Sequence, residues 1–453
     1  MAYKVSNFNI EVEVLDNKNI LMYNTLTSSF GIMDPSTKQI YDEIEQLGEV
    51  DIEKIKDNNN FKTLVEYGYI VPEEFNEYEY IKFQSQYSKY NSNALTLTIA
   101  PTINCNMDCP YCYEKKEDIS MSEEVKIVLY DFVKDYLETK KCSEFYVSWY
   151  GGEPLMDLDT IIDLSNKFIK LCQDKNINYN SSIVTNGVLL DRDTALIISN
   201  QCNVKMAQIT IDGMPDYHNS RRLLKDGRDS FDIIIKNIES IKDIINISVR
   251  VNVDKENMPN IDDLSDFLLY EMGWTDNPSF YLAPVEKYNN SYCNECINEK
   301  EFSDLSINLL KKQYDANPNM NYNYKLYPQR RVNFCSAVRT GNYVVDPDGD
   351  LYTCWNLVGQ KEKKIGNIIQ KNSMNTEYIK WLLHEPIGRC LSCKLLPACS
   401  GGCPYQAIIN GKSKCDMTLK NYKDTLKLAY NKFIEKKNNN MLSKMNESRD
   451  FNA

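Results

Sequence analysis

The stretch Cys105-Asn106-Met107-Asp108-Cys109-Pro110-Tyr111-Cys112 places three cysteines within eight residues. Three thiolates are one ligand short of the four that hold a cubane iron–sulfur cluster, so a [4Fe-4S] cluster bound here would keep one iron open for another ligand. An apolar, β-prone segment at 95–100 comes just before the motif. The cysteines are therefore predicted to lie on a loop at the carboxyl end of a strand, where barrel folds place their reacting groups.

Two other roles for these cysteines are weaker. A zinc site would need a fourth Cys or His, and the only histidines, His218 and His384, are distant in sequence. A disulfide framework is disfavoured because we expect no signal peptide, and the chain is long and apolar enough to form a core without covalent bridges. The cluster is the better interpretation.

Composition sets the outer limits of function. A chain of 453 residues predicts about two to four domains, and 42 % hydrophobic with 26 % charged residues is typical of a soluble globular protein. No apolar run reaches the roughly 20 residues of a membrane span, and a net charge of -12 disfavours binding to nucleic acid. Seven of the 15 cysteines fall between Cys335 and Cys415. That density predicts metal clusters in a reducing, anaerobic cytoplasm.

Strand-like and helical segments alternate from residue 94 to 287, which predicts βα units around a parallel sheet. With the cysteine motif after its first strand, this region resembles the radical SAM superfamily. The resemblance implies a partial (β/α)6 barrel and S-adenosylmethionine bound to the open iron, where an electron cleaves it to methionine and a 5′-deoxyadenosyl radical. Strands are expected at 95–100, 144–149, 181–184, 206–211, 247–253 and 279–284, and helices at 123–137 and 158–172.

Further cofactor contacts are expected at the ends of these strands. Gly-Gly-Glu at 151–153 matches a family turn that approaches the amino group of the cofactor, and glycines permit such an approach. The hydroxyl, amide and carboxylate groups at 185–186 and 210–212 suit ribose and the methionine carboxylate. Arg250 either faces inward to pair with that carboxylate or outward as a solvated charge, and Tyr111 either packs near the adenine or belongs to the core. The expected contacts are Tyr111, Gly151, Gly152, Glu153, Thr185, Asn186, Thr210, Asp212 and Arg250.

Residues 1–90 are predicted to form a separate domain. Alternating apolar residues at 10–14 and 20–23 predict a hairpin, and helices are expected near 34–47, 51–56 and 60–67. This layout resembles a winged helix and the quinone-cofactor chaperone-like domains that recognise leader peptides, in which an extended leader would add a strand to a sheet edge. The alternative is a plain extension of the barrel. The polar segment 77–93 is expected to be a linker.

The segment 288–334 is expected to connect the barrel to a third domain. It contains Cys293 and Cys296, which are either free thiols or metal ligands, and a helix is expected near 302–314. Cys142, Cys172 and Cys202 are expected to be buried or inert.

Residues 335–424 resemble the SPASM extension of radical SAM enzymes, with an Asp-Gly hairpin expected at 344–352. The resemblance implies two auxiliary [4Fe-4S] clusters, hence three in all. Residues 425–453 are expected to form a helix and a tail that frays after about Lys437. One auxiliary cluster would be held by Cys390, Cys393, Cys399 and Cys415, and the other by Cys335, Cys354 and Cys403.

The second auxiliary set bears on the reaction. The sulfatase-maturing branch has a further cysteine before the first of the seven and a catalytic aspartate after the second, whereas here 327–334 lack a cysteine and Trp355 follows Cys354. An iron without a protein ligand could bind a peptide thiolate, lower its pKa and hold the sulfur near a carbon radical. Alternatively Cys293, Cys296 or a non-cysteine group completes the site.

The sequence therefore predicts a cytoplasmic radical SAM/SPASM peptide maturase that forms thioethers, with no catalytic residue assigned beyond the cofactor ligands. Its expected partners are a cysteine-rich precursor peptide with a leader and a low-potential donor such as flavodoxin or ferredoxin. Two alternatives are a formylglycine-forming sulfatase-maturing enzyme and a non-catalytic iron–sulfur protein that binds peptides or transfers electrons.

Overall fold

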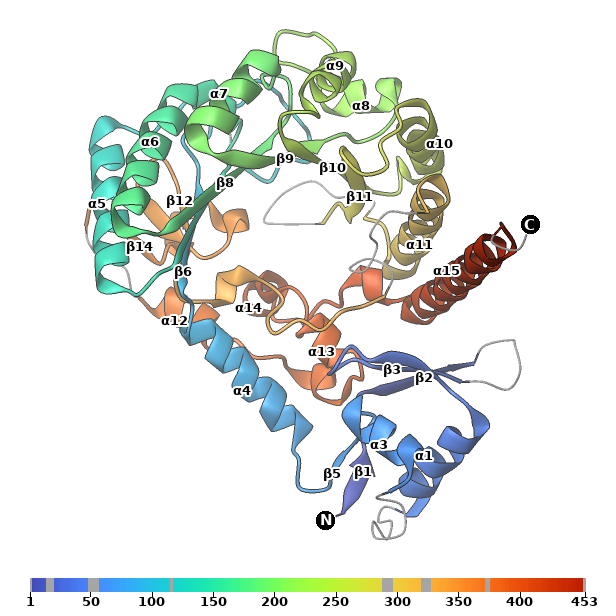
Figure 1. Cartoon of the computed structure of the whole chain (residues 1–453). Coiled ribbons are helices and arrows are strands. Elements are labelled where there is room, and N and C mark those ends of the chain that lie inside the picture. Colours follow the sequence, from blue (N-terminus) through green and yellow to red (C-terminus); the bar gives the residue numbers. More distant parts are fainter. Residues whose placement is uncertain are drawn as a thin grey trace.

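A curved sheet with helices on its outer side forms the largest part of the protein (Figure 1). The structure, a computed structural model, describes residues 2–13, 20–47, 57–114, 117–286, 296–318, 327–370 and 375–450. Within them, nine strands follow the order β11-β10-β9-β8-β7-β6-β12-β13-β14. The six strands of the predicted partial barrel pair in parallel: β6 (Ala94–Ile99), β7 (Glu144–Trp149), β8 (Asn178–Thr185), β9 (Val204–Thr210), β10 (Asn246–Val253) and β11 (Ser279–Pro284).

Helices follow these strands as βα units require. In α5 (Glu123–Thr139) the Ser122 side chain caps the first turn, and Val125, Leu129, Val133 and Leu137 recur every fourth residue on the buried face. The other helices of the barrel are α6 (Leu158–Lys175), α7 (Arg192–Cys202), α8 (Pro215–Arg221), α9 (Phe231–Ile241), α10 (Ile261–Asp266) and α11 (Glu299–Ala316). The predicted barrel and the predicted helices at 123–137, 158–172 and 302–314 are confirmed.

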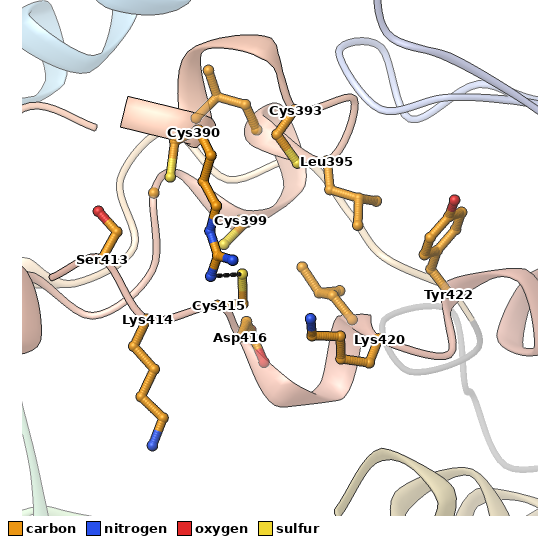
Figure 2. A pocket seen from close by; sticks show the side chains of 14 residues that line it. Cys390, Cys393, Leu395, Cys399, Ser413, Lys414, Cys415, Asp416, Lys420 and Tyr422 are labelled. Carbon is orange, nitrogen blue, oxygen red and sulfur yellow. Dashed lines mark hydrogen bonds between the residues drawn. The ribbon is translucent and has the colours of Figure 1, made fainter. Parts of the chain in front are cut away.

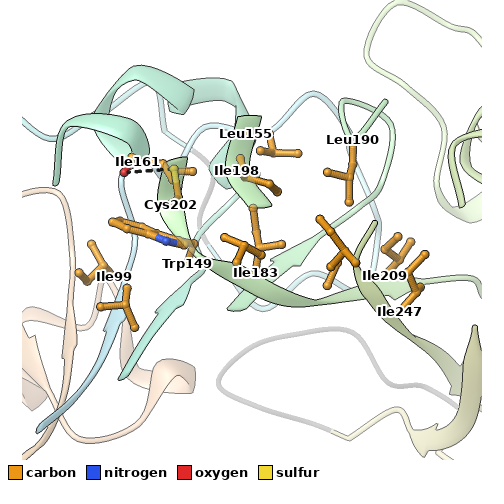
Figure 3. Close-up of a cluster of buried hydrophobic side chains, with 14 of the residues drawn as sticks. Ile99, Trp149, Leu155, Ile161, Ile183, Leu190, Ile198, Cys202, Ile209 and Ile247 are labelled. Carbon is orange, nitrogen blue, oxygen red and sulfur yellow. Dashed lines mark hydrogen bonds between the residues drawn. The ribbon is translucent and has the colours of Figure 1, made fainter. Parts of the chain in front are cut away.

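The two faces of the sheet differ in polarity. Along β10 the residues alternate, with Val249 and Val251 buried beneath the helices and Ser248, Arg250 and Asn252 half-exposed on the other side, here called the inner face. Figure 3 shows the buried side, where strand residues such as Trp149 and Ile183 pack with Ile198 of α7. The inner face therefore remains polar and accessible to a ligand.

The amino-terminal region contains more strand than expected. β2 (Asn9–Glu13), β3 (Ile20–Asn24) and β4 (Phe30–Met33) form an antiparallel sheet in which the predicted hairpin gains a third strand. β1 (Tyr3–Val5) pairs with β5 (Ile70–Pro72), and the helices are α1 (Pro35–Leu47) and α3 (Asn59–Glu66). The helix expected at 51–56 lies outside the described residues.

The segment expected to be a linker, 77–93, is helical over most of its length. Glu77–Tyr90 form the helix α4, because Asn76 caps its amino end by accepting from the backbone N–H of Glu79, and Glu77 and Glu79 suit the helix dipole there. Side chains of α4 contact the carboxyl-terminal part of the chain: Lys89 donates to the carbonyl oxygens of Leu382 and His384. A helix packed at both ends replaces a polar tether.

The carboxyl-terminal region is continuous with the barrel. The predicted hairpin forms from β12 (Asn342–Val345) and β13 (Asp350–Tyr352), and β12 also pairs in parallel with β6, so one sheet spans both parts. β14 (Gly366–Asn367) completes it, and the helices α12 (Thr376–Leu382), α13 (Leu396–Cys399), α14 (Pro404–Asn410) and α15 (Tyr422–Asp450) follow. The helix expected at the carboxyl end is α15, and fraying after about Lys437 stays a prediction. In the described part, no helix is long and apolar enough to cross a membrane.

Candidate functional site

Loops from the ends of three strands converge on the cysteine motif. The N–H groups of Gly152 and Glu153 donate to the carbonyl oxygens of Thr102 and Asn104 at 3.2 and 2.8 Å. Asn186 Nδ2 donates to Asn106 Oδ1 at 2.6 Å. The loops after β6, β7 and β8 thus form one surface around Cys105.

The glycines after β7 are required by close packing. A Cβ atom on Gly151, where φ is +118°, would lie 2.3 Å from Thr102 O, and one on Gly152 would lie 2.3 Å from Asn104 O. Neither contact is sterically possible, and the φ of Gly151 also disfavours other residues. The Gly-Gly pair therefore fixes the distance between the cofactor turn and the cysteine loop.

Glu153 is fully buried and connects the loop after β7 to the loop after β8. Its carboxylate accepts from Thr185 Oγ1 at 2.8 Å, from the N–H of Asn186 at 2.7 Å and from the N–H of Leu155 at 3.1 Å. Burial raises the pKa of Glu153, while these hydrogen bonds oppose the shift. The structure thus brings the predicted residues Glu153, Thr185 and Asn186 together, with Glu153 directed at the protein backbone.

A second polar cluster lies where β9 and β10 end. The Tyr111 hydroxyl donates to Asp212 Oδ2, and Asn252 Nδ2 donates to Asp212 Oδ1 at 3.2 Å. Arg250 donates through Nε to Asn252 Oδ1 at 2.8 Å and pairs in register with Thr210 across the two strands. Arg250 is therefore on the inner face, the first of the two orientations considered, and the other predicted contacts Tyr111, Thr210 and Asp212 lie in the same cluster.

Arg222 completes this cluster and was not assigned from the sequence. Its Nη1 donates to the Tyr111 hydroxyl at 2.5 Å and lies 3.9 Å from Asp212 Oδ2, and the neighbouring guanidinium of Arg221 covers the Tyr111 ring at 4.7 Å. The Arg222 side chain is buried, yet its Nε has no hydrogen-bond partner among the described residues. A buried guanidinium with an unused donor fits an anionic group such as the cofactor carboxylate.

The three cysteines of the motif lie on one loop after β6. Cys105 is buried, Cys109 and Cys112 are half-buried, and the N–H of Met107 points at Cys105 Sγ at 3.4 Å. In the described part of the chain, no three His, Cys, Asp or Glu side chains are preformed around one metal position. The assignment therefore rests on the donor chemistry of three thiols and on the glycine-packed loop, both of which fit a [4Fe-4S] cluster.

Four predicted auxiliary ligands surround one cavity. Figure 2 shows Cys390, Cys393, Cys399 and Cys415 around this space, whose volume is about 290 Å³. Arg389 Nη2 donates to Cys415 Sγ at 3.2 Å, and Lys414 and Lys420 also line the cavity. Thiols with basic neighbours in one cavity fit a cluster of net negative charge.

The remaining predicted set, Cys335, Cys354 and Cys403, packs against one apolar cluster with Tyr352 and Trp381. Burial, followed by the nearby Cys335, raises the pKa of Cys354. Glu286, just after β11, lies near Cys403, contributes to the raised pKa of that thiol, and pairs with Lys414 at 3.0 Å. These contacts bring the three thiols into one region and add a carboxylate that the sequence analysis did not consider.

An aromatic array joins this region to the cysteine motif. The rings of Trp355 and Tyr150 stack with centroids 5.7 Å apart and planes at 14°, and the Tyr150 hydroxyl bonds to that of Tyr113. Tyr113 follows Cys112 and Trp355 follows Cys354. Trp355 nevertheless remains 46 % exposed. It therefore presents an apolar surface between the two cysteine regions.

The other cysteines divide by burial. Cys172 and Cys202 are buried as expected, which raises the pKa of each thiol to about 11, and Cys142 is half-buried. Cys296 forms a disulfide and is therefore neither a free thiol nor a metal ligand. Cys293 lies outside the described residues.

Comparison with known proteins identifies relatives of this chain. Residues 99–268 match the model of the radical SAM superfamily. The cysteine-type anaerobic sulfatase-maturating enzyme of Clostridium novyi is 25 % identical over 354 residues, covering 68 % of this chain and 88 % of that protein. The corresponding enzyme of Clostridium perfringens is 24 % identical, covering 76 % and 99 %.

Solved structures show the same fold. Native anSMEcpe with bound AdoMet and the Cp18Cys peptide matches with a TM-score of 0.58 at 20 % identity, covering 76 % of this chain and 99 % of that one. Streptococcus suis SuiB bound to its precursor peptide SuiA matches with a TM-score of 0.51 at 16 % identity, covering 91 % and 98 %.

The barrel, the cysteine loop and the matching domain define a radical SAM enzyme, which uses S-adenosylmethionine and a [4Fe-4S] cluster. Its overall fold is that of the SPASM-type enzymes of this class, with curated relatives among the anaerobic sulfatase-maturating enzymes and a structural neighbour in SuiB.

Proposed function

We propose that this enzyme modifies a ribosomally made peptide and forms thioether cross-links from the peptide's cysteines. The observation that carries the proposal is Trp355. Directly after Cys354, it places a stacked indole beside Tyr150 where the sulfatase-maturing pattern has a carboxylate base. An indole cannot accept a proton from a substrate thiol, so this position lacks the base of the sulfatase-maturing pattern, which weighs against formylglycine formation.

The net reaction is an oxidation of the peptide. A thioether forms when a cysteine S–H and a C–H are both lost and an S–C bond replaces them. The hydrogen atom of the C–H would leave with the 5′-deoxyadenosyl group of the cofactor, the thiol proton would go to solvent, and the remaining electron would pass to an auxiliary cluster. When bound, S-adenosylmethionine and the cluster supply hydrogen-atom abstraction from an unreactive carbon. The chain's own residues hold these groups in position: the Gly151–Gly152 turn packs the loops, Glu153 fixes the Thr185–Asn186 loop, and Arg222 offers its free Nε to the cofactor carboxylate.

The amino-terminal domain supplies peptide recognition in this proposal. Its β4 is an edge strand of the described three-stranded sheet, and a leader peptide would extend that sheet by strand addition. The match to SuiB covers 91 % of the chain and therefore includes part of residues 1–90. That likeness in fold supports a role for the domain within a peptide-modifying enzyme.

The proposal includes three [4Fe-4S] clusters, a cytoplasmic location, and a flavodoxin- or ferredoxin-like donor of the first electron. The cavity lined by four thiols supports one auxiliary cluster, and the grouping of Cys335, Cys354 and Cys403 supports the other. Glu286 is a candidate for the non-cysteine group that completes the second set.

Formylglycine formation on a sulfatase is the second candidate, favoured by the curated relatives. Mass spectrometry separates the two reactions. The probe is a cysteine-containing peptide encoded beside the gene, incubated anaerobically with the reduced enzyme and S-adenosylmethionine. We expect a product that has lost two hydrogen atoms per cross-link, keeps all its sulfur and resists thiol alkylation. A product that has lost sulfur and reacts with a hydrazide would refute thioether formation.

A further inference from the structure

The amino-terminal domain touches the loop that carries two of the auxiliary thiols. Thr25, fully buried at the end of β3, donates from Oγ1 to the carbonyl oxygen of Lys394 at 2.6 Å. Lys394 directly follows Cys393. Figure 1 shows the same proximity at the level of the fold, with α13 beside β3.

Apolar packing surrounds this hydrogen bond. Phe8 and Leu26 of the amino-terminal domain form a buried cluster with Leu396, and Cys390 packs against it. Leu395 packs against a second cluster that contains Tyr23 of β3. The side chains of Leu395 and Leu396 also line the cavity of the four thiols. The layer between that cavity and the amino-terminal domain is therefore one residue thick.

A second segment that lines the cavity depends on the same domain. Tyr422, at the start of α15, lines the cavity near Leu395 (Figure 2). One turn further along α15, Leu426 is fully buried against the β2–β3 sheet in the cluster that contains Val12 and Tyr23. The loop that contains Leu395 and Leu396 and the start of α15 therefore both pack against the amino-terminal domain.

The loop has little support of its own. Its regular structure consists of a short 3-10 turn, Gly388–Ser392, and the single turn of α13. Leu391, between the two thiols, is 57 % exposed. Short turns with exposed side chains have low local stability, so contacts from outside decide how well they are ordered.

We propose that the amino-terminal domain, besides recognising peptides, is a structural part of the auxiliary site and positions the Cys390–Cys393 loop for its cluster. The inference rests on the proposed auxiliary cluster at Cys390, Cys393, Cys399 and Cys415. Thr25 acts as a positioning residue through Lys394, and Leu26 does so through Leu396. Peptide recognition and the auxiliary site then share one folded unit.

The test measures iron in a protein that lacks the radical cluster. In the full chain with Cys105, Cys109 and Cys112 replaced by Ala, all cluster iron belongs to the auxiliary sites. Thr25→Val and Leu26→Ala are added separately, and Thr63→Val is the matched control, because Thr63 lies exposed on α3 in the same domain. Iron per chain and the rate of iron release to a chelator are recorded anaerobically, with electron paramagnetic resonance of the reduced clusters.

We expect Thr25→Val to accelerate release of about four irons per chain roughly tenfold, as the loss of one buried hydrogen bond suggests. Leu26→Ala should accelerate the release of the same four irons, and Thr63→Val should release iron at the rate of its parent protein. Release rates and spectra unchanged in both variants would overturn the inference while leaving the clusters in place. A parent protein without auxiliary iron would instead refute the auxiliary clusters themselves.

Discussion

The reacting centre depends on a few residues whose roles differ sharply. Cys105, Cys109 and Cys112 offer metal ligands, Glu153 fixes one loop to another, and Arg222 combines charge with an unused donor. Glu153 and Arg222 are each linked to their neighbours by hydrogen bonds, so single substitutions distinguish their roles.

Replacing Cys105, Cys109 and Cys112 together by Ala should abolish formation of 5′-deoxyadenosine, because no thiolate is left to hold the cluster that cleaves the cofactor. Auxiliary iron should remain, since its thiols lie in another part of the chain. Chromatography of the cofactor products and an iron assay report both quantities. Cofactor cleavage in this variant would contradict the assignment.

Arg222→Met should weaken binding of S-adenosylmethionine by about ten- to a hundredfold, the range expected for a lost hydrogen bond to a charged group. The matched control is Arg228→Met, because Arg228 is exposed and pairs only with Asp226 in the described structure. Equilibrium dialysis with labelled cofactor measures both affinities. Equal affinity in the Arg222 variant and the parent would place the cofactor carboxylate elsewhere.

His218 gives the cluster a defined pH dependence. Its Nδ1 accepts from the Asp212 N–H at 3.3 Å, and its Nε2 lies 3.1 Å from Ser230 Oγ, whose proton goes to Arg222 O at 2.6 Å. The neutral ring with a proton on Nε2 satisfies all three contacts. Burial, and secondarily the charge of Arg222, lowers the pKa of His218 well below 6.5.

Because only the unfolded chain gains this proton below pH 6.5, the free energy of unfolding should fall as the pH falls, by up to about 1.4 kcal/mol per pH unit. Urea unfolding followed by circular dichroism under anaerobic conditions measures the slope. His218→Gln keeps a donor and an acceptor but cannot titrate, so its slope should be shallower. His384, whose pKa burial also lowers, is common to both proteins. Identical slopes would contradict the neutral buried role of His218.

At the scale of elements, the edge strand β4 offers a specific test of peptide recognition. Asn24 donates to Ser29 O at 2.9 Å, and alternation along the antiparallel ladder then directs the N–H and carbonyl groups of Phe30 and Ile32 away from β3. Ile32 is 40 % exposed. Its backbone is therefore available to an added strand.

Ile32→Pro removes this outward N–H without breaking the β3–β4 ladder, whereas Ile32→Ala keeps it. We expect the proline variant to bind the leader of the neighbouring precursor about five- to tenfold more weakly, as the loss of one backbone hydrogen bond suggests, and the alanine variant to bind nearly as the parent does. Fluorescence anisotropy with a labelled leader measures the affinities. Equal binding by both variants would remove strand addition at β4.

Elements with strong periodicity could be predicted from the sequence. The alternating β10 and the four-residue spacing of α5 follow local patterns, and the spacing of the cysteines identified the loop chemistry. The polar composition of α4 concealed a helix because its stability comes from capping and from distant contacts such as Lys89 with Leu382. Likewise β12 joins β6, and Trp355 meets Tyr150, only through tertiary packing.

At the scale of the whole molecule, three parts act as one assembly. A single sheet joins the barrel to the carboxyl-terminal domain, and the amino-terminal sheet packs against α15 and the auxiliary loop. This continuity places the cysteine motif, the auxiliary thiols and the amino-terminal domain in fixed relation. A peptide held by one part would therefore reach the others without a flexible tether.

The most direct test of peptide modification is hydrogen transfer from the peptide to the cofactor. A precursor peptide deuterated at its carbon positions is incubated with the reduced enzyme and S-adenosylmethionine, and the 5′-deoxyadenosine formed is analysed by mass spectrometry. The account predicts that deuterium appears in 5′-deoxyadenosine in proportion to the modified peptide. Deuterium-free 5′-deoxyadenosine beside an unchanged peptide would contradict it.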